Sequence, residues 1–237
     1  MTGSSGINGD NFYISPDQRI FVLADGASGA GKHGKAAMSS TCVDIARRFD
    51  FASAGLPPRG YVDALFHNIN SALIELSQRE GILCFGTIVA AFVEGSALWV
   101  TTYGDSPAYL LQRGKVVRAA RNRKRYEDMV DDGIITQKRY DKYATNMHER
   151  MQGVFDRYIP EIVPNHVIEQ YSLSPGDMFA ACSDGLSDWI APERIFEEIQ
   201  RSGIEASIDE LMTVARDKAL RKQKYFDDIT AIAFAVN

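Results

Sequence analysis

The sequence is poor in cysteine and histidine, has no excess of positive charge and contains no long apolar run. Three of its 237 residues are cysteine and four are histidine. Cys42, Cys84 and Cys182 are odd in number and widely spaced, which excludes a disulfide framework and a zinc site of closely spaced thiolates. A site of soft ligands is therefore not expected, whereas a site of carboxylate oxygens for a hard cation remains open.

The charge balance argues against two classes of partner. Lys and Arg number 26 against 31 Asp and Glu, a net charge of −5. Nucleic-acid binding needs a basic surface, and the short basic run at 118–125 is closely followed by acidic residues at 127–132, as in a solvated helix.

No apolar run approaches the roughly 18 residues of a membrane helix, and residues 1–9 lack the features of a signal peptide. We therefore expect a cytoplasmic protein with no nucleic-acid or membrane partner.

The organisation of the chain predicts one domain. The composition is that of a globular protein, with 45% hydrophobic and 24% charged residues, and we find neither repeats nor a linker. We therefore treat residues 1–237 as one domain, with a polar and helical segment at about 121–151. In the first half we expect a buried strand at 20–24, a glycine-rich loop at 26–34, and helices at about 35–49 and after Pro57-Pro58.

The rest of the sequence predicts a sandwich. β-branched and aromatic residues favour strands at 87–93, 97–102 and 108–111, which read as an antiparallel meander with tight turns. Further strands are expected at 178–182 and 229–236, and helices near Pro192 and from a capping box at Ser207 to about Arg221. Several strands are apolar on both faces. This pattern predicts an α+β fold, a four-layer α-β-β-α sandwich of two packed antiparallel sheets flanked by helices.

Four aspartates lie at the terminus of a predicted strand: Asp25, Asp105 and Asp184 follow a strand, and Asp227 comes just before the last one. If the strand ends meet, their like charges repel and raise one another's pKa values. Divalent cations remove this repulsion, and oxygen ligands favour Mg²⁺ or Mn²⁺. The alternative is structural, because Asp-Gly after a strand is typical of a turn. The spacing alone does not decide between the two.

The glycine-rich loop allows a competing interpretation. Gly26 to Lys32 matches the first seven positions of a Walker A loop, lying after a strand and before a helix. The eighth position is His33 instead of the Ser or Thr that holds Mg²⁺, and the strands do not alternate with helices. The sequence therefore favours a turn rich in small residues over a nucleotide-binding loop.

Five short motifs follow one another along the chain: FVLADG (21–26), FGT (85–87), VTTYGDSPAY (100–109), CSDGLSD (182–188) and DDITAI (227–232). In this order they resemble the motifs of the metal-dependent PP2C (PPM) family of protein serine/threonine phosphatases, and their short spacing is similar to that of its bacterial members. The resemblance implies a β-sandwich flanked by helices. It also implies hydrolysis of phosphoserine and phosphothreonine in a phosphorylated protein substrate, opposing a serine/threonine kinase.

The resemblance also implies a set of site residues. Asp25 would bridge two Mn²⁺ or Mg²⁺ ions, with the carbonyl of Gly26 on one ion and Asp184 and Asp227 on the other. Asp105 would form a third, weaker metal site together with Asp184. Asp10, in the stretch NGDN (8–11), would act as a catalytic residue that orients metal-bound water. The segment at 121–151 would form the variable flap beside the site.

The sequence departs from the family pattern at several positions. Gly9 stands where the family has Glu, Ser5 where it has a phosphate-gripping Arg, and Asp228 where it has Asn. The substrate-binding residues are therefore unknown, and phosphate would be held by Lys32, by Lys35 or by metal ions alone. These departures leave open an alternative function, a phosphatase-like binding or regulatory module with weak or no turnover.

Overall fold

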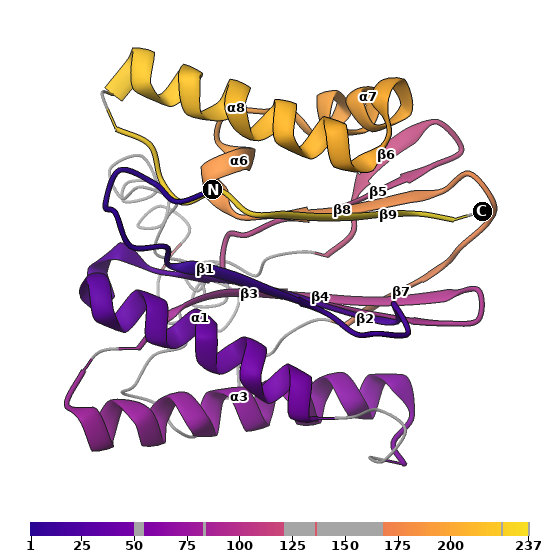
Figure 1. The fold of residues 1–237 in the computed structure, drawn as a ribbon. Coiled ribbons are helices and arrows are strands. Elements are labelled where there is room, and N and C mark those ends of the chain that lie inside the picture. The colour runs from indigo at the N-terminus through magenta and orange to yellow at the C-terminus, as the bar shows by residue number, and fades with distance from the viewer. Residues whose placement is uncertain (50–54, 83, 121–135, 137–167, 224, 237) are drawn as a thin grey trace.

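The protein is built as four layers, in the order helix, sheet, sheet, helix (Figure 1). The computed structural model describes residues 1–49, 55–82, 84–120, 136, 168–223 and 225–236. Helices α1 and α3 cover the outer face of one sheet, and α6, α7 and α8 cover the outer face of the other (Figure 1). The predicted α-β-β-α sandwich of antiparallel sheets is confirmed.

The first sheet has five antiparallel strands in the order β1-β2-β3-β4-β7. Its buried central strands are apolar on both faces, because one face meets the helices and the other meets the second sheet. The bounds are β1 Asp10–Ile14, β2 Ile20–Gly26, β3 Gly86–Glu94, β4 Ala97–Tyr103 and β7 Glu169–Ser172.

The second sheet has four antiparallel strands in the order β6-β5-β8-β9. The bounds are β5 Ala108–Gln112, β6 Lys115–Arg118, β8 Met178–Cys182 and β9 Ala231–Ala235. Strand β8 lies inside this sheet and is followed directly by the short helix α6, Asp184–Ser187. The sheet therefore places the start of α6 next to the residues that precede β9.

The longer helices begin and end where their sequences favour it. Helix α3, Pro58–Glu80, has proline in its first turn and ends at Gly81 with φ +65°. Helix α7, Pro192–Ser202, also begins at proline and ends at Gly203 with φ +79°. The remaining elements are a 3-10 turn η1, Ser28–Ala30, and helices α1, Gly31–Arg48, and α8, Ile204–Gln223.

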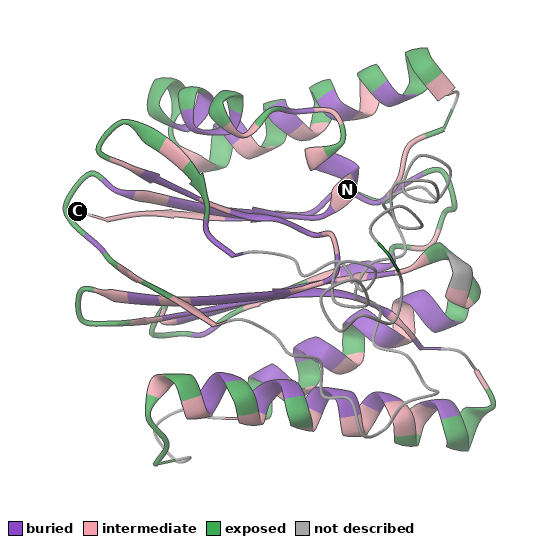
Figure 2. Ribbon diagram, turned by 180° about the vertical axis from the view of Figure 1, so that it is seen from behind, coloured by how far each residue is buried: buried purple, intermediate pink, exposed green. Residues whose placement is uncertain are grey.

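Three apolar clusters bind the four layers together, and in Figure 2 the buried colour covers much of the central strands and recurs along the helices. The first joins α1 and α3 to the five-stranded sheet through residues such as Phe66, Ile69 and Phe92. The second lies between the sheets, where Phe179 and Phe234 stack at 5.2 Å. The third joins the four-stranded sheet to α7 and α8. Burial of this apolar surface is the main favourable contribution to folding.

The prediction of one continuous meander through 87–111 is wrong at its last turn. Strands β3 and β4 form a hairpin as expected, but β4 and β5 belong to different sheets. Residues 104–107 are therefore a crossover between the sheets instead of a hairpin turn. Hydrophobic patterning could not reveal this, because both strands are apolar in either arrangement.

The predicted capping box at Ser207 is also wrong. Gly203 ends α7, and α8 begins immediately afterwards at Ile204, so Ser207 lies inside the helix. Its hydroxyl donates to the carbonyls of Glu198 (2.7 Å) and Gly203. The side chain thus binds backbone carbonyls of the preceding helix and turn instead of capping a new helix.

The predicted flap at 121–151 falls, apart from Thr136, outside the described residues. None of the helices in the described ranges is both long and apolar enough to cross a membrane.

Candidate metal centre

The topology brings the predicted site residues to one end of the sandwich, at the left in Figure 1, where α1 and α6 begin. Asp10 in β1 lies directly opposite Asp25 in β2. Asp105 lies in the crossover between the two sheets. Asp184 is the first residue of α6, and Asp227 lies in the segment that leads into β9. Both sheets thus contribute aspartates to the same end.

Hydrogen bonds fix the strand ends of the four-stranded sheet to one another and to the crossover. The amide of Cys182 donates to the carbonyl of Pro107 at 3.1 Å, which ties the crossover to β8. Ser183 donates its amide to Thr230 O, and Thr230 donates its amide to Ser183 Oγ, each at 3.0 Å. The loops that carry Asp105, Asp184 and Asp227 are therefore fixed relative to one another.

The aspartates lie close enough to influence each other's ionisation. Burial is the largest cause that raises the pKa of Asp25 well above its ordinary value, followed by the charges of Asp10, Asp184 and Asp227. Burial, followed by the charges of Asp105 and Asp227, raises the pKa of Asp184 to about 8. All five predicted aspartates thus form one electrostatic cluster, and its repulsion favours the binding of cations.

Asp10 carries the clearest sign of a missing ligand. Its side chain is 6% exposed, with Ser183, Asp25 and Thr230 beside it, yet neither carboxylate oxygen has a hydrogen-bond partner of normal geometry. Burial, with the charge of Asp228 as a further cause, raises its pKa to about 6. A buried carboxylate without partners is unfavourable. A cation or a water held by a cation would satisfy it.

Gly26 lets helix α1 approach the site. A Cβ atom at this position would lie 2.6 Å from the Cα of Lys35, so the close packing of α1 on β2 requires glycine. The Gly26 amide donates to Gly9 O at 3.0 Å, which continues the β1–β2 ladder to its end. Gly26 is therefore fixed between β1 and α1, directly after Asp25.

The residue types fit a site for hard divalent cations. Aspartate and carbonyl oxygens are the ligands of Mg²⁺ and Mn²⁺, and the clustered charges and the unpartnered Asp10 call for positive charge. Within the described ranges, no three Asp, Glu, His or Cys side chains are arranged to hold one ion directly. Binding would therefore require side-chain rotation, or water and backbone oxygens as further ligands.

A buried hydrogen bond at this end of the sandwich was not predicted. Thr87 in β3 lies opposite Asp25, and its hydroxyl lies 2.5 Å from the Oγ of Ser106, the residue after Asp105. Both residues are buried. Although they belong to the motifs FGT and GDS, their contact depends on how the two sheets meet. The bond links the strand next to Asp25 to the crossover that carries Asp105.

We expect Ser106→Ala to lower the free energy of unfolding by about 1–3 kcal/mol, because it leaves the buried Thr87 hydroxyl without its partner. Urea unfolding measures the change. Ser40→Ala, at an exposed position on α1, is the control and should change stability by less than about 0.5 kcal/mol. Equal stability of the two variants would show that the Thr87–Ser106 bond contributes nothing.

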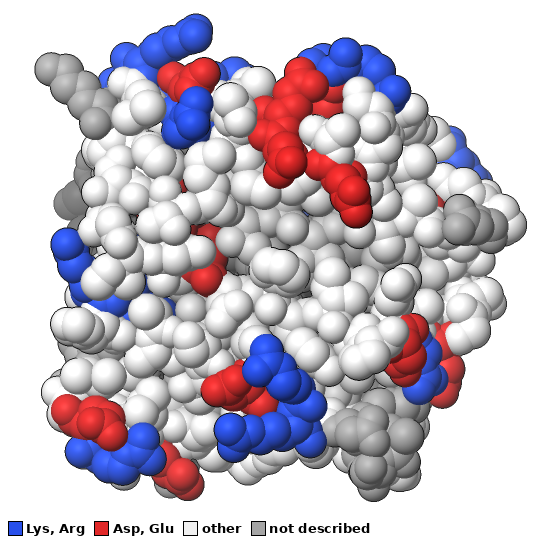
Figure 3. All heavy atoms as spheres, viewed as in Figure 1, with Lys and Arg blue, Asp and Glu red and all other residues white. Residues whose placement is uncertain are grey.

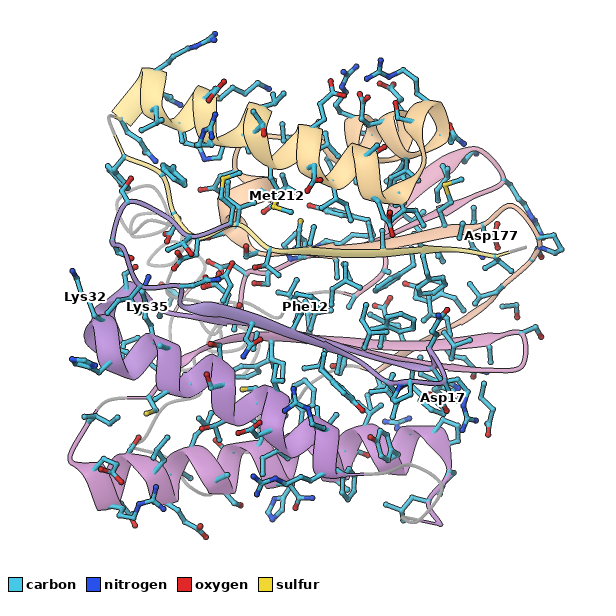
Figure 4. All side chains as sticks on the ribbon, viewed as in Figure 1. Phe12, Asp17, Lys32, Lys35, Asp177 and Met212 are labelled. Atoms are coloured by element: carbon cyan, nitrogen blue, oxygen red, sulfur yellow. The ribbon has the colours of Figure 1, made fainter. Side chains whose placement is uncertain are left out.

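The two lysines considered for phosphate binding lie near the start of α1 but in different environments (Figure 4). Lys32 is exposed, whereas Lys35 is buried and its ammonium pairs with Asp228 at 2.5 Å. Lys35 is thus already paired inside the protein, and Lys32 remains the candidate of the two for binding a substrate phosphate.

The Walker A interpretation does not fit the fold. Strand β2, which precedes the loop, pairs antiparallel with β1 on one side and with β3 on the other. A nucleotide-binding loop of this type belongs to a parallel βαβ unit. The loop instead connects β2 to α1 beside the aspartate cluster.

Comparison with known proteins points to one family. No protein-family model matches the chain. In sequence it is 27% identical over 215 residues to the serine/threonine protein phosphatase PstP of Mycobacterium tuberculosis, across 88% of this chain and 39% of PstP. The chain therefore spans about two fifths of the length of this curated relative.

Solved structures of bacterial phosphatases share the fold. PstP superposes with a TM-score of 0.74 at 23% identity, covering 98% of this chain and 94% of that structure. Stp1 of Staphylococcus aureus gives 0.75 at 21% identity, covering 100% and 92%. A further structure of the PstP catalytic domain contains two manganese ions and gives 0.70 at 23% identity, covering 98% and 93%.

The chain thus has the fold of the PP2C (PPM) protein phosphatases. It is similar to bacterial serine/threonine phosphatases of this type over nearly its whole length. The resemblance inferred from five short motifs is confirmed.

Proposed function

We propose that this protein hydrolyses phosphoserine and phosphothreonine in proteins, at a site that holds two divalent cations and a third, weaker one. The observation that carries the proposal is the convergence of four aspartates from both sheets with a fifth, Asp10, whose buried carboxylate is unpartnered. The similarity to PstP and Stp1 supports it.

The proposed ligands follow from the positions of the aspartates. Asp25 and the carbonyl of Gly26 would hold one ion. Asp25 would also be a ligand of a second ion, which Asp184 and Asp227 would hold. Asp105 together with Asp184 would hold the third. When bound, such ions lower the pKa of water and neutralise phosphoryl oxygens, which permits direct attack of hydroxide on phosphorus.

The residues of the chain position these reactants. The two oxygens of Asp10 are free to accept hydrogen bonds and would orient the attacking water. The hydrogen bonds of Ser183, Thr230 and Pro107 hold the loops of Asp105, Asp184 and Asp227 in register. Within the described residues, Cys42, Cys84 and Cys182 are buried and burial raises their pKa values, so none of these thiols is suited to attack phosphorus.

The proposed substrates and setting follow from the same comparison. A phosphoprotein substrate and an opposing serine/threonine kinase are proposed because the relatives are serine/threonine protein phosphatases. A cytoplasmic location without membrane partners stays a proposal, and the net charge of −5 supports the absence of a nucleic-acid partner. In the view of Figure 3, charged side chains of both signs gather over the two helix layers, and much of the band between them is uncharged.

A second candidate function is a phosphatase-like module that binds phosphorylated ligands with weak or no turnover. It is favoured by Ser5, which has replaced the phosphate-gripping Arg, and by the burial of Lys35. The aspartate cluster favours hydrolysis, because a module that only bound phosphate would gain nothing from five clustered acids.

The test is hydrolysis of p-nitrophenyl phosphate and of a phosphothreonine peptide, with Mn²⁺, with Mg²⁺ and with excess EDTA. We expect turnover with either cation and a loss of at least 100-fold in EDTA, restored by added Mn²⁺. Binding of the phosphopeptide without hydrolysis under any cation would establish the binding module instead. Full activity in EDTA would rule out a metal-dependent centre.

A further inference from the structure

A buried ion pair lies beside the aspartate cluster. The Nζ of Lys35 lies 2.5 Å from Oδ2 of Asp228, and the two side chains are only 4% and 3% exposed. The ammonium also donates to the Oγ of Ser5 at 3.0 Å. Lys35 comes from α1, Asp228 from the segment before β9, and Ser5 from the segment before β1. The pair therefore joins three parts of the chain that are distant in sequence.

Asp228 also holds the segment that leads into β1. Its Oδ1 accepts the amide of Gly3 at 2.6 Å, and its Oδ2 accepts the amide of Gly9 at 2.8 Å. One carboxylate therefore fixes both ends of residues 3–9. Asp10 follows Gly9 directly, so the position of its backbone depends on this contact.

Gly9 and Lys35 are also matched in shape. A Cβ atom at position 9 would lie 2.7 Å from Cδ and 3.0 Å from Cγ of Lys35, and 3.1 Å from the carbonyl oxygen of Gly26. The stem of Lys35 thus lies in the space that a side chain at position 9 would need. The absence of a side chain at Gly9 is what allows the ammonium to reach Asp228.

The energetics of such a pair suggest a role beyond stability. Burying two charges is unfavourable, and well-packed apolar residues of the same volume are often as stable or more stable. Removing one partner, in contrast, leaves an unpaired buried charge and is strongly destabilising. Apolar residues could not fix the orientation of the backbone here. The Asp228 carboxylate does so, because it accepts hydrogen bonds from Gly3, Gly9 and Lys35 together.

We propose that Lys35 and Asp228 are positioning residues, which fix residues 3–9 across the end of the sandwich and so hold Asp10 at the aspartate cluster. This inference rests on the proposed function for its effect on turnover, but not for its effect on the segment itself. Because a displacement of about 1 Å at a catalytic group can reduce the rate by about 100-fold, loosening the segment should reduce turnover.

The first variant is Lys35→Met, which preserves the length of the stem and removes the charge. We expect faster hydrogen exchange in the peptide that covers residues 1–14. We also expect weaker Mn²⁺ binding by calorimetry, and kcat for p-nitrophenyl phosphate reduced by about 10- to 100-fold with KM within about twofold. Lys115→Met, at an exposed position on β6, is the matched control and should leave all these quantities unchanged. Unchanged exchange and kcat in Lys35→Met would overturn the proposal.

The double variant Lys35→Met/Asp228→Ala separates positioning from charge balance. It contains no unpaired buried charge, so we expect its melting temperature to exceed that of Lys35→Met, while exchange stays fast and kcat stays low. A double variant with wild-type exchange and kcat would show that the pair only balances charge, and would overturn the proposal.

Gly9→Ala tests the same contact with both charges present, and serves if Lys35→Met fails to fold. The added methyl displaces the Lys35 stem, so we expect faster exchange over residues 1–14 and a kcat reduced by at least fivefold. Wild-type exchange would contradict the positioning role. If the wild-type protein shows no metal-dependent hydrolysis, the proposed function fails, whereas the exchange measurements still decide whether the pair fixes the segment.

Discussion

Asp25→Asn should reduce kcat/KM for p-nitrophenyl phosphate by about 1,000-fold or more at saturating Mn²⁺. Asp25 lies at the centre of the cluster, where the charges of Asp10, Asp184 and Asp227 all act on it. The substitution preserves the size of the side chain but removes the charge proposed to bridge two cations. The loss should appear in kcat, since ions that bind water and phosphoryl oxygens stabilise the transition state. Steady-state kinetics with increasing Mn²⁺ measure it.

Asp17→Asn is the matched control, because it makes the same chemical change at an exposed position. Asp17 lies in the turn between β1 and β2, at the opposite end of these strands from Asp10 and Asp25, and pairs with Arg19 at 2.7 Å (Figure 4). Exposed pairs of this kind contribute little, so activity should stay within about twofold of wild type. If Asp25→Asn retained as much activity as Asp17→Asn, the assigned metal centre would be wrong.

The metal-free protein should lose stability as the pH rises from 5 to 8, and Mn²⁺ should restore it. Asp10 and Asp184 have pKa values raised from 3.8 to about 6 and about 8. A carboxyl group whose pKa is higher in the folded state holds its proton more tightly there, so its contribution falls as the pH rises from its unfolded to its folded value. For Asp10 the whole interval from pH 3.8 to about 6 corresponds to on the order of 3 kcal/mol, of which about 1 kcal/mol lies above pH 5.

Differential scanning fluorimetry in EDTA should therefore show a melting temperature about 5–10 °C lower at pH 8 than at pH 5. Millimolar Mn²⁺ should remove most of this difference, because a ligand of the folded state stabilises it. Asp184→Asn should flatten the pH dependence in EDTA, whereas Asp17→Asn should not, because the pKa of Asp17 is lowered to about 2 and lies below this range. Identical pH profiles for both variants would contradict the clustering of charge at the site.

Much of the fold was predictable from local patterns. The strand at 178–182 has the predicted bounds, and the helix after Pro57-Pro58 lies where its apolar face placed it, because buried elements have strong hydrophobic patterns. Strands β1, β6 and β7 were not predicted. They lie at sheet edges, and their sequences, DNFYI, KVVR and EQYS, contain few buried residues. Their extended conformation is stabilised by backbone pairing with one neighbouring strand, and not by burial of their side chains.

The site was predictable as a set of residues but not as an arrangement. Aspartates at strand termini, two of them followed by glycine, pointed to a cluster, and the family resemblance added Asp10. The pairing of Lys35 with Asp228 had no such signal, because 193 residues separate them. A lysine that follows a glycine-rich loop, as Lys35 does, suggests a phosphate ligand from sequence alone. Only the packing of α1 against Gly9 and Gly26 shows that its charge is used internally.

The bond between Gly3 and Asp228 spans 225 positions of the sequence. During synthesis the first partner therefore leaves the ribosome long before the second exists, and the aspartate cluster stays incomplete until almost the whole of this chain has emerged. The proposed metal centre could therefore form only after the segment that leads into β9 has been synthesised and has docked.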